Sequence, residues 1–151
     1  MRAVIQRVSA ASVTVDGQIV GEVGRGFLVL LGVTHDDTVE DSRVIAGKLV
    51  GLRVFTDEND FMNLSLSDVG GSVLLVSQFT LYADAKRGRR PSFVSAARPE
   101  VAGPLVDFVR DQIESHGAAV ATGTFGAHMD VALHNDGPVT ILLETRLGRL
   151  I

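Results

Sequence analysis

The chain has 151 residues, of which 46% are hydrophobic and 21% charged, so it is long enough to fold as one globular domain with a sizeable core. Its net charge of −4 argues against a protein that coats nucleic acid through charge alone. The absence of cysteine excludes disulfides, thiolate nucleophiles and cysteine-ligated zinc. No apolar run approaches the roughly 20 residues of a membrane-spanning helix, and the charged start does not match a signal peptide. We therefore expect a soluble, cytoplasmic protein without membrane contact.

The first third of the chain carries strand patterns followed by a helix pattern. Alternating or continuously apolar side chains predict four strands, at residues 2–8, 12–16, 18–23 and 26–33. The dipeptide Asp16-Gly17 is a strong hairpin signal between the second and third of these strands. Cap-type residues then precede a helix that we predict from about Thr38 to Leu52. The helix is expected to bury one stripe of side chains, namely Val44, Ile45, Lys48, Leu49 and Leu52.

The rest of the chain continues the mixture of strands and one further helix. The expected strands are residues 53–56, 72–79, 118–122, 129–134 and 139–144. The second helix is predicted from Pro99 to about Ser115, and His116-Gly117 is its C-terminal stop. No repeat, low-complexity segment or linker interrupts the pattern. Residues 1–151 are therefore predicted to form a single α/β domain.

Two short segments stand out because they are suited to recognition by the main chain. Gly137-Pro138 lies between two apolar runs, and it predicts a stiff turn with accessible carbonyls because proline fixes φ and glycine has no Cβ. Ser77-Gln78-Phe79-Thr80-Leu81 ends an apolar strand with small polar groups. Together they indicate a site built from backbone groups rather than from a nucleophilic triad.

A family pattern runs through nearly the whole chain. Its segments are Ile5-Gln6-Arg7-Val8, Ala11-Ser12-Val13-Thr14-Val15, Leu28-Val29-Leu30-Leu31-Gly32-Val33, Met62-Asn63-Leu64, Gly70-Gly71-Ser72-Val73, Val76-Ser77-Gln78-Phe79-Thr80-Leu81, Arg90-Pro91-Ser92-Phe93 and Asn135-Asp136-Gly137-Pro138-Val139-Thr140. This pattern resembles the D-aminoacyl-tRNA deacylase family, whose members hydrolyse the ester between a D-amino acid and tRNA. The Ser-Gln-Phe-Thr and Gly-Pro-Val-Thr segments are the two signature motifs of that family.

The resemblance implies a sheet or barrel-like core with two main helices, and a homodimer with active sites at the subunit interface. It implies that Ser77, Gln78, Phe79 and Thr80 form the catalytic segment. The peptide Gly137-Pro138 is expected to be cis, and to reach into the partner's pocket, where its carbonyls engage the substrate's amino group. Phe125, Ala127 and Met129 are expected to pack against the terminal adenine of the tRNA. No cofactor and no metal are expected.

The implied chemistry needs no strong nucleophile, because an aminoacyl ester on ribose is already activated. Backbone N–H groups near Phe79 and Thr80 are candidate donors to the oxyanion. The ribose 2′-OH of the tRNA is thought to help activate water in the family. Thr80 is either a nucleophile or an orienting group, and we favour the orienting role. If a rigid backbone selects handedness by steric exclusion, glycine is accepted too, and glycine mischarged on alanine tRNA becomes a second substrate.

Several alternatives remain open from the sequence. Without the resemblance, Ser77 and Thr80 are strand-end caps, Gly137-Pro138 is an ordinary turn, and Phe125 and Met129 are core residues. A non-catalytic tRNA-end binder, or a sibling enzyme with a trans Gly-Pro that acts on L- or N-modified aminoacyl-tRNA, would share the pattern. The histidine–aspartate pairs at residues 128–130 and 134–136 are weak candidates for zinc. Residues 86–90, with four cations in five positions, form either a solvated loop or a phosphate contact.

Overall fold

The computed structural model describes every residue from Met1 to Ile151. The strands are β1 (Arg2–Val15), β2 (Gln18–Val23), β3 (Gly26–Gly32), β4 (Phe55–Thr56), β5 (Met62–Leu64), β6 (Ser72–Ser77), β7 (Ala119–Thr122), β8 (Asp130–Arg146) and β9 (Arg149–Leu150). The helices are α1 (Val39–Val50) and α2 (Pro99–Ser115), and a short 3₁₀ helix, η1 (Phe79–Tyr82), follows β6.

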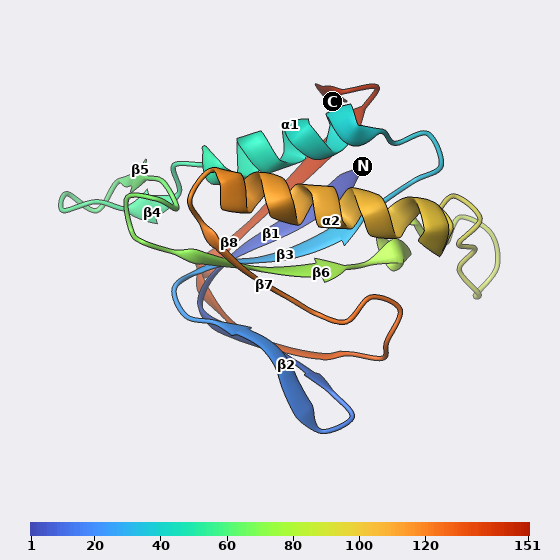
Figure 1. Ribbon diagram of the computed structural model, residues 1–151, viewed down its shortest axis with the longest axis horizontal. Coiled ribbons are helices and arrows are strands. Elements are labelled where there is room, and N and C mark those ends of the chain that lie inside the picture. The colour runs from blue at the N-terminus through green and yellow to red at the C-terminus, as the bar shows by residue number, and fades with distance from the viewer.

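Seven of the strands form one curled sheet in the order β7-β6-β3-β1-β8-β9, with β2 paired to the far half of β1. The pairs β3–β6 and β6–β7 are parallel, and the other pairs are antiparallel. The β1–β2 hairpin swings round until β2 lies against β7, where a Cβ on Gly21 would come 2.5 Å from the carbonyl oxygen of Thr122. The sheet is therefore a half-barrel (Figure 1).

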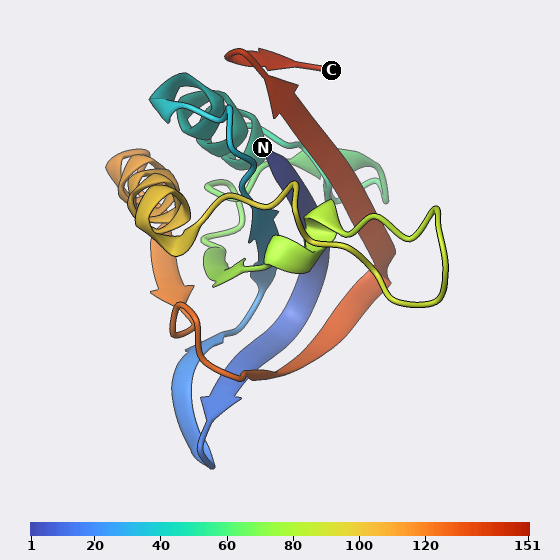
Figure 2. The ribbon, with the colours of Figure 1, turned by 90° about the vertical axis from the view of Figure 1, so that its right-hand side faces the viewer.

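Both helices lie side by side on one face of this sheet (Figure 1 and Figure 2). Between helices and sheet lies a cluster of 20 buried residues, centred on side chains such as Ile5, Phe27, Val29 and Leu75. A smaller cluster of six, which includes Val8, Leu28 and Leu74, fills the inside of the curl. The arrangement confirms the predicted α/β class with a barrel-like sheet and two main helices.

Helix α1 begins where the cap residues predict it. Thr38 N–H donates to the Asp41 carboxylate at 3.0 Å, and the other carboxylate oxygen accepts the N–H of Gly148 at 3.0 Å. Burial alone would raise the pKa of Asp41, but these hydrogen bonds together hold it below its ordinary value. The predicted stripe is partly wrong, because the buried positions are Asp41, Ser42, Ile45, Ala46 and Leu49, whereas Lys48 is exposed.

Three of the predicted element boundaries change in ways that matter for the site. The two predicted N-terminal strands are one strand, β1. Strand β6 stops at Ser77, so Phe79 and Thr80 belong to η1 and not to a strand end. The two predicted C-terminal strands are the single strand β8, which runs through Gly137-Pro138 without reversing direction. The predicted turn is therefore wrong, and the chain makes a bulge there because tertiary pairing with β1 continues on both sides of it.

Candidate active site

A cavity of about 380 Å³ opens where β6 ends under the first turns of α2. Ser77, Gln78 and Phe79 form one wall, and Phe125 and Gly126, from the loop after β7, form another. The remaining lining residues are apolar side chains from the end of β3 and the residue after it, from the segment before α2 and from α2 itself: Leu31, Val33, Phe93, Ala96, Ala97, Pro99, Ala102 and Val106. Segments from distant parts of the sequence, from Leu31 to Gly126, thus share one cavity.

The end of β6 exposes backbone donors because the sheet ladder stops and a tight turn starts. Gln78 N–H still donates to Leu31 O at 2.8 Å, as a continuation of the β3–β6 pairing. The first bonded amide of η1 is that of Leu81, which donates to Gln78 O at 3.2 Å. The amides of Phe79 and Thr80 lie between these two, at the turn's start, where donors have no partner within the helix. They have no backbone acceptor and are therefore the candidate donors to a ligand's oxygen.

Thr80 is exposed and lies one residue beyond the cavity wall. Its hydroxyl oxygen accepts a hydrogen bond from the side-chain Nε2 of Gln78 at 2.5 Å. The hydroxyl proton therefore remains available for donation to a water or ligand. Since the bound neighbour is an amide and not a base, the contact orients the hydroxyl without increasing its nucleophilicity.

The cavity has an aromatic rim and no charge. The rings of Phe79 and Phe93 meet edge to face with their centroids 5.2 Å apart, and Phe125 is 45% exposed on the opposite side. None of the lining residues is ionisable. An adjoining hollow of about 170 Å³ includes Asp107, but that carboxylate is held by Arg110 at 3.0 Å. The cavity therefore offers stacking surface and backbone dipoles, and no side chain placed to act as a general base.

Two other residues singled out from the sequence lie outside the cavity wall. Ala127 follows Gly126 in the turn after β7, with its N–H donating to Thr124 O at 3.2 Å. Met129 packs against the smaller cluster inside the curl, and its sulfur lies close to Gly123. No group of three or more His, Asp or Glu side chains gathers anywhere in the structure.

The second signature segment is a bulge in β8. Gln6 pairs with Thr140 and Val8 pairs with Asn135, so four residues of β8, 136–139, face the single residue Arg7 of β1. Val139 N–H donates to the Asn135 side-chain oxygen at 2.9 Å, which closes the bulge. The excursion is thus a fixed structure and not a loose loop.

Arg7 of β1 fixes this bulge through a hydrogen bond and an ion pair with Asp136. The residue is 7% exposed. Its side chain donates to Asp136 O at 3.0 Å and to Val54 O at 2.5 Å, and it lies 3.2 Å from the Asp136 carboxylate. Arg7 belongs to the first segment of the family pattern but is not among the predicted site residues. A signal was present, because Ala3, Ile5 and Arg7 share one face of β1, and a buried arginine in an apolar row needs partners.

Gly137 and Pro138 are exposed on this bulge, and the peptide between them is cis, as the resemblance implies. Gly137 has φ +134°, and a Cβ there would lie 2.7 Å from Val139 Cγ2 and 3.1 Å from an Arg7 nitrogen. Only glycine fits this position without displacing its neighbours.

Within one protomer the bulge and the cavity stay apart. Strands β6, β3, β1 and β8 are consecutive in the sheet, so β8 is three spacings, roughly 14 Å, from β6. Through successive pairings Ser77 is level with Leu143, whereas the bulge begins beyond Thr140. The structure thus joins Ser77, Gln78, Phe79 and Phe125 in one cavity and leaves Gly137 and Pro138 outside it.

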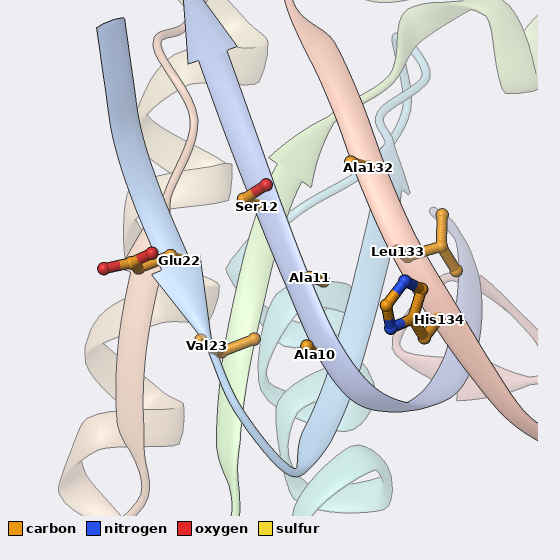
Figure 3. Close-up of a pocket in the computed structure, with 8 residues that line it drawn as sticks. All are labelled: Ala10, Ala11, Ser12, Glu22, Val23, Ala132, Leu133 and His134. Carbon is orange, nitrogen blue, oxygen red and sulfur yellow. The ribbon is translucent and has the colours of Figure 1, made fainter.

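A second hollow, of about 270 Å³, lies on the open face of β1, β2 and β8 (Figure 3). Its floor is made largely of small side chains such as Ala10, Ser12 and Ala132. Its ionisable residues are Glu22 and His134, and Glu22 points away from the others (Figure 3). Because no polar groups converge there, this hollow lacks the features of a catalytic site.

Comparison with known proteins matches residues 4–144 to the sequence model of the family described as D-Tyr-tRNA(Tyr) deacylase. The chain belongs to that family. A protein of Chloroflexus aurantiacus named D-aminoacyl-tRNA deacylase is 58% identical over 150 residues, covering 99% of this chain and 94% of that protein. One of Exiguobacterium sibiricum with the same name is 57% identical, covering 95% and 99%.

Solved structures agree with the family's fold. The structure titled c-Myc DNA Unwinding Element Binding Protein superimposes with a TM-score of 0.90 at 40% identity, over 97% of this chain and 99% of that one. A structure described as a probable eukaryotic D-amino acid tRNA deacylase has a TM-score of 0.76 at 22% identity, over 93% and 97% of the two chains, and supports the fold alone. Neither helix of the present chain is both long and apolar enough to cross a membrane.

Proposed function

We propose that this protein hydrolyses the ester bond of D-aminoacyl-tRNA in the cytoplasm and releases the free D-amino acid and tRNA. Membership of the family and the names of its close relatives support this activity. The observation that carries the proposal is the uncharged cavity at the end of β6, which is lined by three phenylalanine rings and adjoins the unpaired amides of Phe79 and Thr80. Such a cavity fits an activated ester and a nucleobase better than it fits a substrate that needs a strong base.

In this proposal the main chain supplies most of the catalysis. The amides of Phe79 and Thr80 donate to the oxyanion that forms when water adds to the ester carbonyl, and fixed donors of this kind stabilise it without reorganisation. The Thr80 hydroxyl, oriented by Gln78, positions the water. The terminal adenine stacks on the aromatic rim near Phe125. The 2′-OH of the terminal ribose helps to activate the attacking water, because the protein supplies no general base.

The second half of the site comes from another copy of the chain. Because the bulge lies about three strand spacings from its own cavity, Gly137 and Pro138 reach a substrate only in a partner's cavity. An apolar row supports a homodimer: Leu142, which is 75% exposed, pairs with Val4, and Val4 pairs with Leu30 on the sheet face without helices. A twofold axis through this face would bring the same row of each copy together.

Handedness then follows from steric exclusion. When the carbonyls of residues 137 and 138 hold the substrate's amino group, one enantiomer directs its side chain outward and the other directs it into the wall. A clash of about 3 kcal/mol gives roughly a hundredfold discrimination. Glycine has no side chain to clash, so glycyl-tRNA, including glycine mischarged on alanine tRNA, is also a substrate.

The test is the release of amino acid from matched D-tyrosyl-, L-tyrosyl- and glycyl-tRNA. We expect rapid release of D-tyrosine and glycine and at least about a hundredfold slower release of L-tyrosine. Cleavage of the L-ester in preference to the D-ester would instead identify an editing enzyme of the opposite chirality. Glycyl-tRNA left intact beside a cleaved D-ester would refute steric exclusion, and activity abolished by chelation would refute the metal-free mechanism.

A second candidate is nucleic-acid binding without turnover. The solved structure named c-Myc DNA Unwinding Element Binding Protein favours this candidate, because that name refers to binding and not to hydrolysis. The same release assay separates the two, because a pure binder retains the tRNA but leaves every ester at its spontaneous rate.

A further inference from the structure

The strongest concentration of charge on the molecule lies in the loop of residues 84–92, here called the basic loop. Lys86, Arg87, Arg89 and Arg90 are all exposed, and none forms an ion pair, although other arginines, such as Arg2, Arg43 and Arg110, do. The net charge of the chain is −4, and residues 86–90 contribute +4, so the remainder carries −8. A polyanion is therefore attracted to this loop and repelled by the rest of the protein.

The basic loop has a defined structure that is closed by hydrogen bonds. Its base is closed by two backbone hydrogen bonds between Asp84 and Ser92, at 2.8 and 2.9 Å. The Asp84 carboxylate accepts the N–H of Lys86 at 2.9 Å, so the acidic group at the base is used on the backbone and leaves the four cations unpaired. Figure 2 shows the yellow-green loop standing out from the body. Its four cations are exposed and can therefore meet an external partner.

Both ends of the basic loop are tied to the cavity. The loop follows η1 almost directly, and Phe93, the residue after its base, lines the cavity and contacts the ring of Phe79. Arg90 lies three residues before Phe93, so their Cα atoms are at most about 11 Å apart. Along a stacked strand of nucleotides, with roughly one charge per 3.4 Å, that distance is about three nucleotides.

From this placement we infer that the basic loop binds phosphates of the tRNA strand just inside its 3′ end, while the terminal nucleotide occupies the cavity. The inference rests on the proposed function and adds the surface that holds the rest of the substrate. The cavity, being uncharged, recognises the ester and the terminal nucleoside. The basic loop supplies the affinity that depends on the polynucleotide and on salt.

The test compares two esters and two variants. D-Tyrosyl-tRNA carries the phosphate chain, whereas D-tyrosyl adenosine presents the same ester without it. One variant replaces Arg87, Arg89 and Arg90 with Gln. A matched control replaces Lys48, Arg146 and Arg149 with Gln. These three cations are exposed, form no ion pair and belong to α1, β8 and β9 rather than to the basic loop, and their replacement causes the same change in net charge.

We expect the loop variant to lower kcat/KM for D-tyrosyl-tRNA about tenfold or more through KM, and to leave hydrolysis of D-tyrosyl adenosine unchanged. The dependence of log kcat/KM on log salt should become less steep by about two to three, because each lost phosphate contact removes about one. The control variant should match the wild type on both esters.

Three results would overturn the inference: an unchanged kcat/KM for D-tyrosyl-tRNA, a parallel loss on the adenosine ester, or an equal loss in the control variant. The proposed function fails differently, since wild-type protein would then cleave neither ester, and the inference would fall with it. A wild type active on both esters, beside a loop variant unaffected on tRNA, would remove the inference alone.

Discussion

The two signature segments lie on strands of one sheet, but their surroundings differ. Residues 77–80 run from the last residue of the central strand β6 into η1, and their surroundings come from the same chain: Phe125 from the loop after β7, and a wall contributed by α2. Residues 136–139 bulge from β8 with Arg7 fixed beneath them, yet Gly137 and Pro138 are exposed to solvent. In the proposed function, the first segment has a cavity but no group that selects chirality, and the second is the rigid group that selects chirality but has no cavity of its own.

If the proposed function is right, this difference accounts for how a cavity without ionisable groups selects one enantiomer. Selection between enantiomers requires a second surface at a fixed position relative to the cavity. The rigid bulge can provide that surface only if a defined interface between two copies of the chain holds it there. The row formed by the exposed Leu142 and the half-buried Val4 and Leu30 gives the most direct way to test this dependence.

Leu142→Arg should have the largest effect on activity. In a dimer, the arginine of each copy would be buried against the apolar row with no acidic partner, at a cost of several kcal/mol. We therefore expect a folded monomer. Because each cavity then lacks a bulge, kcat/KM for D-tyrosyl-tRNA should fall at least about a hundredfold. Light scattering gives the oligomeric state and amino-acid release gives the rate.

The control for this prediction is Leu147→Arg. Leu147 is 76% exposed, against 75% for Leu142, but it lies in the turn between β8 and β9 and not on the apolar row. This variant should remain dimeric and active. A monomeric Leu142→Arg protein with full activity would show that one chain forms a complete site.

Gly137→Ala should have the next largest effect, because it disturbs the bulge of β8 and leaves the cavity unchanged. At φ +134° an alanine costs about 1–3 kcal/mol, and its Cβ would press on Val139 and Arg7. We expect kcat/KM for D-tyrosyl-tRNA to fall about tenfold to a hundredfold, with the dimer intact. Gly24→Ala is the matched control, since a Cβ at Gly24 meets nothing within 4 Å.

Mixing two impaired variants sharpens the comparison further. Ala96→Trp places a large side chain on the cavity wall, and Gly137→Val disables the bulge. If each site takes its cavity from one chain and its bulge from the other, half of the randomly mixed dimers contain one intact site. Activity should then return to about a quarter of the wild-type value. No recovery from two folded dimeric variants would mean that both segments act within one chain.

Much of the fold could be predicted because local patterns and tertiary packing agree. Thr38 and Pro99 mark the two helix starts, and Asp16-Gly17 marks the hairpin, through the physical preferences of single residues. The bulge could not be predicted in this way. Gly-Pro usually marks a turn, and only the pairing of β8 with β1 on both sides of residues 136–139 makes it an excursion within a strand.

Arg7→Lys should have a smaller effect and should act on selectivity. Lysine keeps the charge but cannot bind Asp136 O and Val54 O at once with a planar fork, so the bulge loses a fixed support. We expect the preference for D- over L-tyrosyl-tRNA to fall about tenfold, with a smaller loss in the D-rate. A lower melting temperature with unchanged chiral preference would make Arg7 only a structural residue.

The cavity residues show a different limit of the sequence. Ser77, Gln78 and Phe79 could be singled out by their motif, but the motif alone predicts a strand through Phe79. The wall from Ala96 to Val106 was not predicted at all, because which side of α2 faces the end of β6 is decided by packing and not by local preference. The orientation of the Thr80 hydroxyl by Gln78 likewise requires the turn η1.

Thr80→Ala should have the smallest effect, and it tests whether the cavity segment works through its backbone. The change removes one exposed hydrogen bond with Gln78 and leaves the amides of Phe79 and Thr80 in place. A contact of this kind contributes about 1 kcal/mol, so the single-turnover rate on D-tyrosyl-tRNA should fall about fivefold. Thr80→Ser should recover most of that loss because it restores the hydroxyl. If the hydroxyl were the nucleophile, the alanine variant would bind D-tyrosyl-tRNA normally and lose roughly a thousandfold or more in rate. The main chain would then no longer explain catalysis, and the cavity would need a base that its uncharged lining does not contain.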